Sequence, residues 1–347
     1  MKKILMIGIT PPVEGGSEKH ILELSSRIKN SKVLTQEGSF CKNKIELSVP
    51  KGPTFLRNII FAGLVKLYAI YLLLKFKKEY DLIHIHENLL YFLVPWLRLR
   101  YEVVVTVHGI KGFSYYDNKF LWFFFKIPLK FANKLIAVNL EDQRLLRNEV
   151  GGEIIYIPNG VDFKIYKKIK EKIEKKVTFL GRIHKQKGII YLLEAFSELS
   201  SKYPEFVLEI IGKKNDYQKE LSKIFSSPKI IWKGYVESKE KIAKELKSSY
   251  CIILPSLWEG LPLTLIESLA SGRPVIVSDI SAFKSIIKDE ALFSKVKNIE
   301  DLKEKIELLL RNKKKSNVLG KKGEKLSKRY DWDRIARNLE KFYEEVK

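Results

Sequence analysis

Short apolar runs alternate with helix-like segments along the first half of the chain. The apolar runs predict buried β-strands at residues 3–9, 32–34, 82–86, 103–107, 135–138 and 154–157. Helical periodicity between them predicts helices over residues 17–28, 56–77 and 89–97. Strands that alternate with helices at this spacing are typical of a parallel sheet.

The same alternation restarts after a Lys- and Glu-rich stretch at residues 164–176, which we expect to be a solvated connector. Strands are predicted at residues 177–180, 206–211, 230–233, 251–254 and 275–278, and helices at 189–200, 217–224, 239–246 and 330–346. A chain of 347 residues exceeds what one core usually supports. We therefore predict two α/β domains, residues 1–162 joined by the C-terminal helix 331–347, and residues 163–330.

Cysteine content and hydropathy bear on the compartment. The two cysteines, Cys41 and Cys251, lie far apart and form no disulfide or metal-binding pattern, which favours a reducing, cytoplasmic environment. The apolar run near the N-terminus is too short for a signal-peptide core. Residues 59–74 are the most apolar long stretch, but Lys66 interrupts them and they fall short of about 20 residues, so we expect no spanning helix.

The formal net charge of +23 indicates an anionic partner, such as nucleic acid, anionic lipid or a phosphorylated substrate. A Lys-, Glu- and Ile-rich surface of the kind found in thermophiles explains the charge equally well. No sequence-specific nucleic-acid motif is present, so we expect no nucleic-acid partner. The chain also lacks a P-loop and the G-x-S-x-G and H-E-x-x-H motifs, which removes support for chemistry through them.

The most informative segment places Glu259 and Glu267 on either side of a predicted strand-to-helix turn, with seven residues between them. In a doubly wound sheet, ligands bind outside the carboxyl ends of the strands, with phosphate at a helix N-terminus. Two carboxylates around such an anion site suit a ligand with hydroxyls at both ends and phosphate in the middle. A nucleotide sugar has this shape, although an ordinary Glu-bearing loop remains the alternative.

Other predicted strand ends carry residues suited to the same ligand. Arg182 and Lys187 follow the first strand of the second half, where a guanidinium and an ammonium group can bind phosphate oxygens. The Gly15–Gly16 pair precedes the first predicted helix and would let backbone N–H groups approach phosphate. His108 ends a strand and can face a cleft. Each of these residues could equally be an ordinary loop residue.

A metal site is a further hypothesis. His84 and His86 lie two residues apart, so on a strand their side chains share a face. Beyond Glu87 the sequence offers no convincing third ligand, and we therefore expect no metal.

Together these segments resemble a family, the retaining, nucleotide-sugar-dependent glycosyltransferases that include phosphatidylinositol mannosyltransferases and sucrose-phosphate synthases. The resemblance covers nearly the whole chain, and its most specific parts are the segment from Glu259 to Glu267 and the loop carrying Arg182 and Lys187. The segments that carry it occur in the family's order at residues 12–20, 81–86, 106–109, 157–162, 181–188 and 259–267. Two positions depart from the family pattern, at residues 213–214 and 279–283, where glycines are common in the family.

The resemblance implies a GT-B fold, two Rossmann-like domains that face each other across a cleft. It implies that Arg182 and Lys187 neutralise the donor diphosphate, that Glu259 contacts the donor sugar and that Glu267 binds the ribose. Gly16 would contact phosphate through its backbone, and His108 would lie beside the transferred sugar as a catalytic residue with Arg182, Lys187 and Glu259. The remaining donor-binding residues that the resemblance implies are Gly15, Gly260, Leu261 and Leu263.

The implied reaction moves a hexose from a nucleotide-diphosphate sugar to an acceptor hydroxyl with retention of configuration, without a metal or other cofactor. An epimerase or a phosphorylase on the same fold remains an alternative, and a non-catalytic, basic membrane-binding protein is more remote. Aromatic residues interleaved with lysines at residues 111–131, and the basic helix at 56–77, match an interfacial pattern. We therefore expect a sugar or lipid-linked acceptor and a peripheral position on an anionic membrane, on its cytoplasmic face, although these aromatics could instead pack inside the protein.

Overall fold

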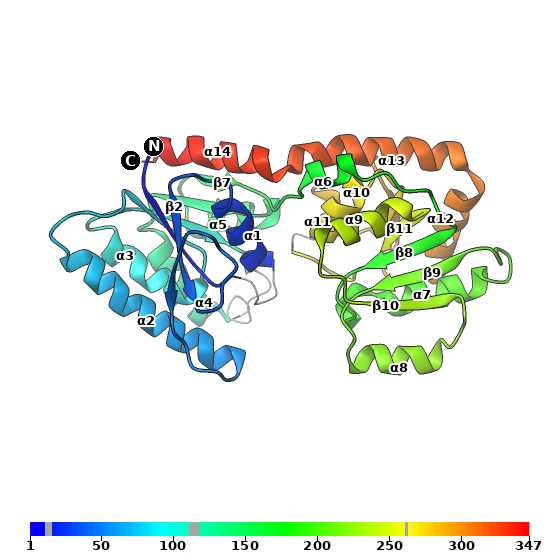
Figure 1. Ribbon diagram of the computed structural model, residues 1–347, viewed down its shortest axis with the longest axis horizontal. Helices are drawn as coiled ribbons and strands as arrows, with labels where there is room; N and C mark the ends of the chain where they lie inside the picture. Colours follow the sequence, from blue (N-terminus) through cyan, green and yellow to red (C-terminus); the bar gives the residue numbers. More distant parts are fainter. Residues whose placement is uncertain (11–15, 111–117, 261–262, 347) are drawn as a thin grey trace. The chain divides into compact units, whose positions relative to one another are not determined.

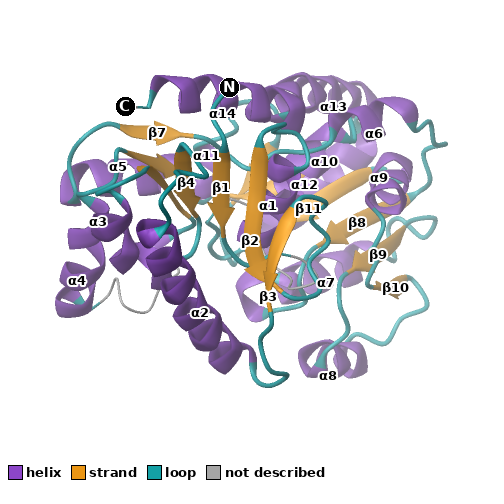
Figure 2. Cartoon of the chain, turned by 60° about the vertical axis from the view of Figure 1, so that its left-hand side comes forward, coloured by secondary structure: helices purple, strands orange, loops and turns teal. Residues whose placement is uncertain are grey.

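The computed structural model describes residues 1–10, 16–110, 118–260 and 263–346. The chain divides into two compact units (Figure 1). The first unit comprises Met1–Gly160 and Trp332–Lys347, and the second comprises Val161–Asp331. In each unit a layer of strands lies between helices (Figure 2). Each unit is therefore a parallel α/β domain of the kind that the alternating pattern predicts.

The first unit contains a seven-stranded sheet with the order β3-β2-β1-β4-β5-β6-β7, and all neighbouring strands are parallel. The strands are β1 Ile4–Ile7, β2 Ser31–Gln36, β3 Lys44–Leu47, β4 Leu82–Ile85, β5 Glu102–Val107, β6 Lys134–Ala137 and β7 Ile154–Tyr156. The strand order reverses direction between β1 and β4. This switch point is where ligands bind in doubly wound sheets.

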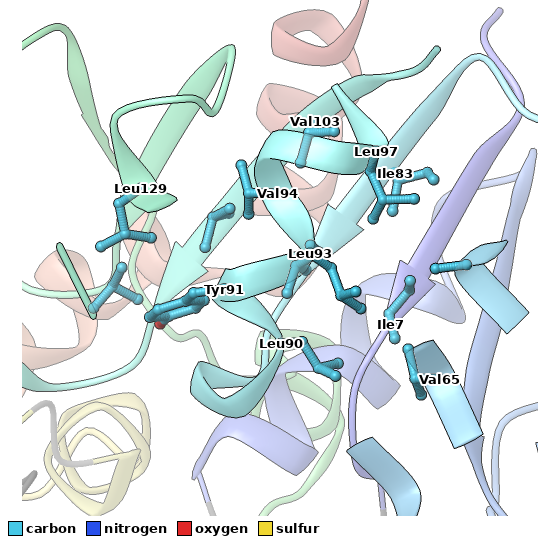
Figure 3. Close-up of a cluster of buried hydrophobic side chains, with 14 of the residues drawn as sticks. Ile7, Val65, Ile83, Leu90, Tyr91, Leu93, Val94, Leu97, Val103 and Leu129 are labelled. Atoms are coloured by element: carbon cyan, nitrogen blue, oxygen red, sulfur yellow. The ribbon is translucent and has the colours of Figure 1, made fainter. Parts of the chain in front are cut away.

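Helices cover both faces of this sheet. Alternate strand residues such as Leu5, Ile7 and Ile83 join one apolar core with the inner sides of the helices on their face (Figure 3). These helices are α2 Thr54–Leu74, the 3-10 helix η1 Asn88–Leu93, α3 Val94–Leu97, α4 Lys119–Leu129 and α5 Leu140–Glu149. The opposite face meets α1 Gly16–Ser25 and the C-terminal helix α14 Trp332–Glu345, as the bond between His84 and Tyr343 shows.

The longest helix, α2, is apolar almost all round. Its inner side is buried in the core through Phe61, Val65 and Leu72, whereas its outer side exposes Leu67 and Leu74. The apolar stretch at residues 59–74 lies within this helix, which begins at Thr54, ends at Leu74 and has 21 residues, close to the helix expected over residues 56–77. Among the described residues it is the one helix that is long and apolar enough to cross a membrane. The core helices of soluble proteins can meet the same criterion of length and composition.

The second unit contains a six-stranded parallel sheet with the order β10-β9-β8-β11-β12-β13. Its strands are β8 Lys176–Leu180, β9 Val207–Ile211, β10 Ile230–Gly234, β11 Cys251–Leu254, β12 Val275–Ser278 and β13 Leu292–Ser294. The order reverses between β8 and β11, so these two strands form the switch point of this sheet. Cys251 in β11 and Cys41 in the first unit are both buried and free.

Helices also cover both faces of the second sheet. One core combines alternate strand residues with α7 Ile189–Leu199, α8 Asp216–Ile224 and α12 Ile299–Arg311. The core on the opposite face combines the strand residues that point to that face with α6 Phe163–Lys168, α9 Lys239–Ser248, α10 Leu263–Ala270 and α11 Ser281–Lys284. The remaining helices are η3 Lys185–Lys187, α13 Lys313–Ser327 and η4 Lys328–Tyr330.

Several elements differ from the sequence expectations. Residues 163–168 form α6 rather than a solvated connector, because Tyr166 is buried in the second unit's core. The single helix expected at 89–97 is a 3-10 turn followed by a short α-helix with Pro95 near its start. Strand β3 was not predicted, since it lies at the sheet edge with no buried residue.

Candidate active site

The two loops that carry the predicted phosphate and sugar contacts leave adjacent strands at the switch point of the second sheet. Residues 181–188 follow β8, and residues 255–260 follow β11. Because β8 and β11 are parallel neighbours, their carboxyl ends lie at the same edge of the sheet. The strand order therefore brings together two loops that are about 70 residues apart in sequence, at the position where such sheets bind ligands.

Gly188 lets the two loops approach closely. Its φ is +61°, a left-handed conformation that favours glycine. A Cβ atom at this position would lie 2.0 Å from the carbonyl oxygen of Pro255. Both constraints exclude a side chain, so the backbone at Gly188 packs directly against the start of the loop after β11.

Backbone and side-chain hydrogen bonds fix the loops to each other. The backbone N–H of Leu257 donates to the carbonyl of Gln186 at 2.8 Å. The Gln186 side chain in turn donates through Nε2 to the carbonyl of Trp258 at 3.0 Å. His184 caps the short η3 turn by accepting from the Gln186 N–H at 3.2 Å. The loops therefore form one hydrogen-bonded unit centred on the buried Gln186.

Two predicted site residues form an ion pair in this unit. The ammonium group of Lys187 contacts Oε1 of Glu259, and the two side chains are only 11% and 7% exposed. The hydroxyl of Ser256 donates to the same Oε1 at 2.7 Å. Glu259 therefore holds the Lys187 ammonium at the carboxyl edge of the sheet, where it can meet a negatively charged group.

Arg182 lies in the same loop but is exposed. Its Nη2 atom is 3.5 Å from Oε1 of Gln186, at the limit of a hydrogen bond. The backbone next to it is fixed, because Asn215 Nδ2 donates to the carbonyl of Ile183 at 2.6 Å. A Cβ on Gly212 would lie 2.2 Å from the carbonyl oxygen of Gly181, which explains the glycine after β9. Of the two cations predicted to bind phosphate, Arg182 is exposed and Lys187 is held by a carboxylate.

The remaining residues predicted to bind the donor surround this loop unit. Glu267 is buried in the second turn of α10. Burial of Tyr166 raises the pKa of its hydroxyl well above the usual range, and the nearby charge of Glu267 adds to this effect. Leu263 begins α10 and is half-buried, and Gly260 is exposed. Leu261 lies outside the described residues.

In the first unit, the predicted residues lie near the switch point of the first sheet. Gly16 is the first residue of α1, and a Cβ there would lie 3.9 Å from Nδ2 of Asn159. Gly15 lies outside the described residues. His108 follows β5 directly, is half-buried, and precedes Gly109, whose φ of +91° turns the chain.

His108 belongs to a cluster of four histidines that sequence reasoning did not assemble. Ring centroids of His20 and His108 are 5.0 Å apart, and those of His86 and His108 are 5.5 Å apart. His86 Nδ1 lies 3.2 Å from His108 Nε2, within hydrogen-bonding distance. His20 Nδ1 lies 2.6 Å from Oδ1 of Asn159. The sequence indicated only that the side chains of His84 and His86 share one face of a strand. The positions of His20 and Asn159 beside them depend on how the chain folds.

The metal hypothesis for His84 and His86 finds no support among the residues that the structure describes. Both ring nitrogens of His84 have hydrogen-bond partners, Tyr343 at 2.5 Å and Thr106 at 2.7 Å. No group of three or more potential ligands among those residues is arranged to hold a metal ion. His84 is therefore a hydrogen-bonded core residue that ties β4 to the C-terminal helix.

Burial controls the protonation of this cluster. Desolvation lowers the pKa of His20 to about 4 and lowers the pKa values of His84, His86 and His108 well below the usual range, with neighbouring imidazoles adding to the effect in these three. The imidazoles are therefore neutral at pH 7. His108 beside a substrate could accept or donate a hydrogen bond as a neutral ring. Burial has the opposite effect on the pKa of two carboxyl groups in the same unit, because it disfavours their charged form. It raises the pKa of Glu87 to about 7 and that of Asp142 to about 6.

The fold and the loop unit at the second switch point define a class. Two Rossmann-like parallel-sheet units constitute the GT-B fold of glycosyltransferases. The family model "Glycosyl transferases group 1" matches residues 162–326, and "Glycosyltransferase Family 4" matches residues 14–164. The chain therefore belongs to the glycosyltransferases of the GT-B fold.

Curated relatives share this class. The chain is 27% identical to an uncharacterised glycosyltransferase of Methanocaldococcus jannaschii, over 99% of this chain and 98% of the relative. It is 29% identical to the UDP-Gal:alpha-D-GlcNAc-diphosphoundecaprenol alpha-1,3-galactosyltransferase of Escherichia coli, over 69% of this chain and 68% of that protein.

A solved structure has the same fold. The Anabaena protein HepE in complex with UDP and glucose superimposes with a TM-score of 0.80, at 16% identity, and each chain is covered completely at 100%. At this identity the match supports the fold alone.

Proposed function

We propose that the protein transfers a hexose from a nucleotide-diphosphate sugar to an acceptor hydroxyl with retention of anomeric configuration. The observation that carries this proposal is the pairing of Lys187 with Glu259 beside Arg182 at the switch point of the second sheet. A cation held in place by a carboxylate, next to a second cation, suits a ligand with an anionic centre and a hydroxyl-bearing end. The names of the relatives, one of which uses a UDP-sugar, support the same ligand class.

In this proposal the donor diphosphate binds Arg182 and Lys187, and the sugar hydroxyls meet Glu259. Glu267 binds the ribose, which suits its position in α10, the helix that follows the loop carrying Glu259. Gly260 and Leu263 border this position. From the first unit, Gly16 contacts phosphate through its backbone, and His108 lies beside the transferred sugar, as the family resemblance implies.

The electrostatics favour departure of the diphosphate. Breaking a glycosyl–phosphate bond develops negative charge on the leaving group, and preorganised cations stabilise that charge most strongly. The diphosphate would compete with Glu259 for the Lys187 ammonium. Glu259 thus positions the cation and, once the diphosphate engages it, becomes available to accept hydrogen bonds from the sugar.

We further propose that this chemistry needs neither a metal ion nor another cofactor. Lys187 and Arg182 supply the positive charge that a divalent ion would otherwise provide. Transfer measured in excess chelator should keep its rate. Complete loss of activity that added Mg²⁺ or Mn²⁺ restores would contradict this part of the proposal.

The proposed acceptor is lipid-linked, and the enzyme then works peripherally at the cytoplasmic face of a membrane. Two observations support this part. The Escherichia coli relative is named for a diphosphoundecaprenol-linked acceptor. In addition, α2 and α4 expose large apolar side chains, including Leu67, Leu74 and Phe120.

The test is product analysis with a panel of UDP-, GDP- and ADP-sugars and a polyprenyl-diphosphate-linked sugar as acceptor. The proposal predicts a new glycosidic bond with the anomeric configuration of the donor, read from the anomeric proton coupling by NMR. Inversion would contradict retention. An isomerised nucleotide sugar without transfer would identify an epimerase, and a sugar phosphate formed from a glycan and phosphate would identify a phosphorylase.

A further inference from the structure

The first unit exposes large apolar side chains over three neighbouring helices. We call the outward sides of α2, η1–α3 and α4, with the residues directly after these helices, the apolar face. Its large exposed side chains include Leu67, Leu74, Trp96, Leu99, Phe120 and Phe123. Soluble monomers rarely expose large contiguous apolar patches, and such patches mark interaction sites. This surface therefore needs a partner.

Helix α2 is the clearest case of a helix in the apolar face that carries apolar side chains on its outer side. Its inner side packs in the core through Phe61, Val65 and Leu72, while Leu67, Ile70 and Leu74 recur at helical spacing on the outside. A helix that faces water normally carries polar residues on its outer side, and one that is apolar all round is buried in protein or lipid. The core accounts for only one side of α2.

The three helices form one continuous surface. In the first unit η1 contacts both α2 and α4, and α3 also contacts α4. The ring centroids of Phe92 in η1 and Phe125 in α4 are 5.4 Å apart. Figure 2 shows α2, α3 and α4 on the same side of the first sheet. A single flat partner could therefore meet all three helices at once.

The charge on this surface is predominantly positive. The sequence of these helices and their ends contains ten lysines and arginines and no Asp or Glu, counted over residues 54–78, 88–101 and 118–131. Exposed members include Lys66 in α2, Arg98 after α3 and Lys130 after α4. Cations interleaved with exposed aromatic and aliphatic side chains are the composition of a surface that meets anionic lipid.

This charge pattern distinguishes a bilayer from a second copy of the chain. Glu79 and Glu149 border the patch, but each already pairs with one of its cations, Lys75 and Lys126. In a two-fold dimer the same patch meets itself, so the remaining cations would face mainly like charges. The packing of α2 likewise distinguishes an in-plane helix from a spanning one. Because its inner residues are buried in the unit's core along the helix, α2 cannot leave the unit to cross a bilayer without breaking that core.

We propose that the apolar face docks on an anionic bilayer, with α2 lying in the plane of the interface and Trp96 and Phe120 entering the headgroup region. This inference deepens the proposed function and rests on it in one respect, the lipid-linked acceptor, which would be presented at the same surface. Lys66, Arg98 and Lys130 face the lipid phosphates.

Vesicle flotation of the full chain tests the proposal. The protein should float with phosphatidylglycerol-containing vesicles at low salt and bind pure phosphatidylcholine vesicles more weakly. Leu67→Ser combined with Phe120→Ser should weaken partitioning by about tenfold or more, because two large apolar side chains no longer enter the interface. The matched control is Ile224→Ser in the second unit, since Ile224 is 63% exposed and Leu67 is 65% exposed. Binding that persists undiminished in the double variant would overturn the proposal.

Tryptophan quenching provides a second readout that does not depend on partition strength. Trp96 is 63% exposed on the apolar face, and Trp258 is 57% exposed in the second unit. Brominated lipids should quench the vesicle-bound protein, and Trp96→Phe should remove most of that quenching, whereas Trp258→Phe should not. The reverse result would assign membrane contact to the second unit. Dimerisation in sedimentation experiments that Leu67→Ser with Phe120→Ser abolishes would instead identify a second copy as the partner.

The two proposals can fail separately. Transfer to a short-chain, water-soluble acceptor analogue should be unchanged in the Leu67→Ser and Phe120→Ser variant, because neither residue belongs to the donor site. Transfer without vesicle binding would contradict the docking surface and the peripheral position at a membrane, and would leave the proposed transfer reaction standing. Vesicle binding without transfer from any nucleotide sugar would do the opposite.

Discussion

Lys187 and Glu259 form an ion pair although 72 positions separate them in the sequence. The pair exists because β8 and β11 are parallel neighbours and because Gly188 lets the loops after them touch. Both side chains are largely shielded from water, which strengthens their interaction relative to a surface pair. The pair therefore links the local fold of the second unit to the proposed handling of the donor diphosphate.

Replacing Glu259 by glutamine should separate these two roles. The Lys187 ammonium would lose its charged partner within a shielded site, which we expect to cost about 1–3 kcal/mol of stability. UDP should then raise the melting temperature of Glu259→Gln more than that of the unmodified protein, because the diphosphate would replace the missing carboxylate. The exposed Glu237 provides the control, since Glu237→Gln should change neither value. An equal or smaller UDP shift in Glu259→Gln would argue against diphosphate binding at Lys187.

Replacing Arg182 by alanine should affect catalysis without affecting folding. Arg182 is exposed, so its loss should change stability by less than about 0.5 kcal/mol. If it stabilises the departing diphosphate, kcat/KM should fall by an amount equivalent to about 2–4 kcal/mol. Lys185, an exposed cation of the same loop, is the matched control, and Lys185→Ala should retain most of the activity. Near-normal turnover by Arg182→Ala would remove Arg182 from the site.

Gly188→Ala should disrupt the loop unit. The substitution combines a left-handed φ with a Cβ 2.0 Å from a backbone oxygen, so we expect a loss of more than about 3 kcal/mol or local rearrangement. Gly234→Ala separates the two causes, because Gly234 has a φ of +84° but its nearest neighbour to an added Cβ is a flexible lysine at 3.7 Å. That variant should lose only about 1–2 kcal/mol. Equal melting temperatures for the two variants would show that the close approach to Pro255 is unimportant.

Acidification should destabilise the protein through the histidine cluster. In the folded protein burial lowers the pKa of His20 to about 4 and those of His84, His86 and His108 well below normal, so these rings bind protons only on unfolding. A lowered histidine pKa therefore costs stability as pH falls below about 6.5, by about 2–3 kcal/mol for His20 at pH 4.5.

Two carboxyl groups oppose this effect, because the raised pKa values of Glu87, about 7, and Asp142, about 6, favour the folded state at low pH. Four histidines outweigh two carboxyls, and together the six groups should take up roughly two protons on unfolding near pH 5. Melting temperatures measured between pH 7 and pH 5 should therefore fall. Stability that rises as pH is lowered over this range would contradict neutral, buried imidazoles.

The sequence allowed the buried elements to be predicted well. Strand β11 follows the apolar run at residues 251–254, because a parallel strand covered on both faces is continuously apolar. Both the Glu-bearing loop after it and the cationic loop after β8 were located from strand ends. The edge strand β3 could not be located in this way, since its pairing with β2 rather than its own burial determines it.

Contacts between distant side chains could not be predicted from the sequence either, because they too depend on how separate parts of the chain pair in the fold. The contact of His20 with Asn159 joins residues 139 positions apart and depends on how α1 folds over the sheet. Gln186 lies within a predicted phosphate loop, yet nothing in the sequence indicates that it would bond to the backbone of the other loop. The roles of Arg182, Lys187, Glu259, Glu267 and His108 in binding and catalysis remain predictions.

The most direct measurement of the central claim is calorimetric binding of UDP-, GDP- and ADP-sugars to the unmodified protein and to Lys187→Ala and Arg182→Ala. The account predicts that one nucleotide class binds, and that each substitution weakens its binding by at least about tenfold, which corresponds to about 1.4 kcal/mol for a lost phosphate contact. Lys185→Ala should bind the same ligand normally. Binding of no nucleotide sugar, or equal affinity in all four proteins, would contradict a donor site at the switch point of the second unit.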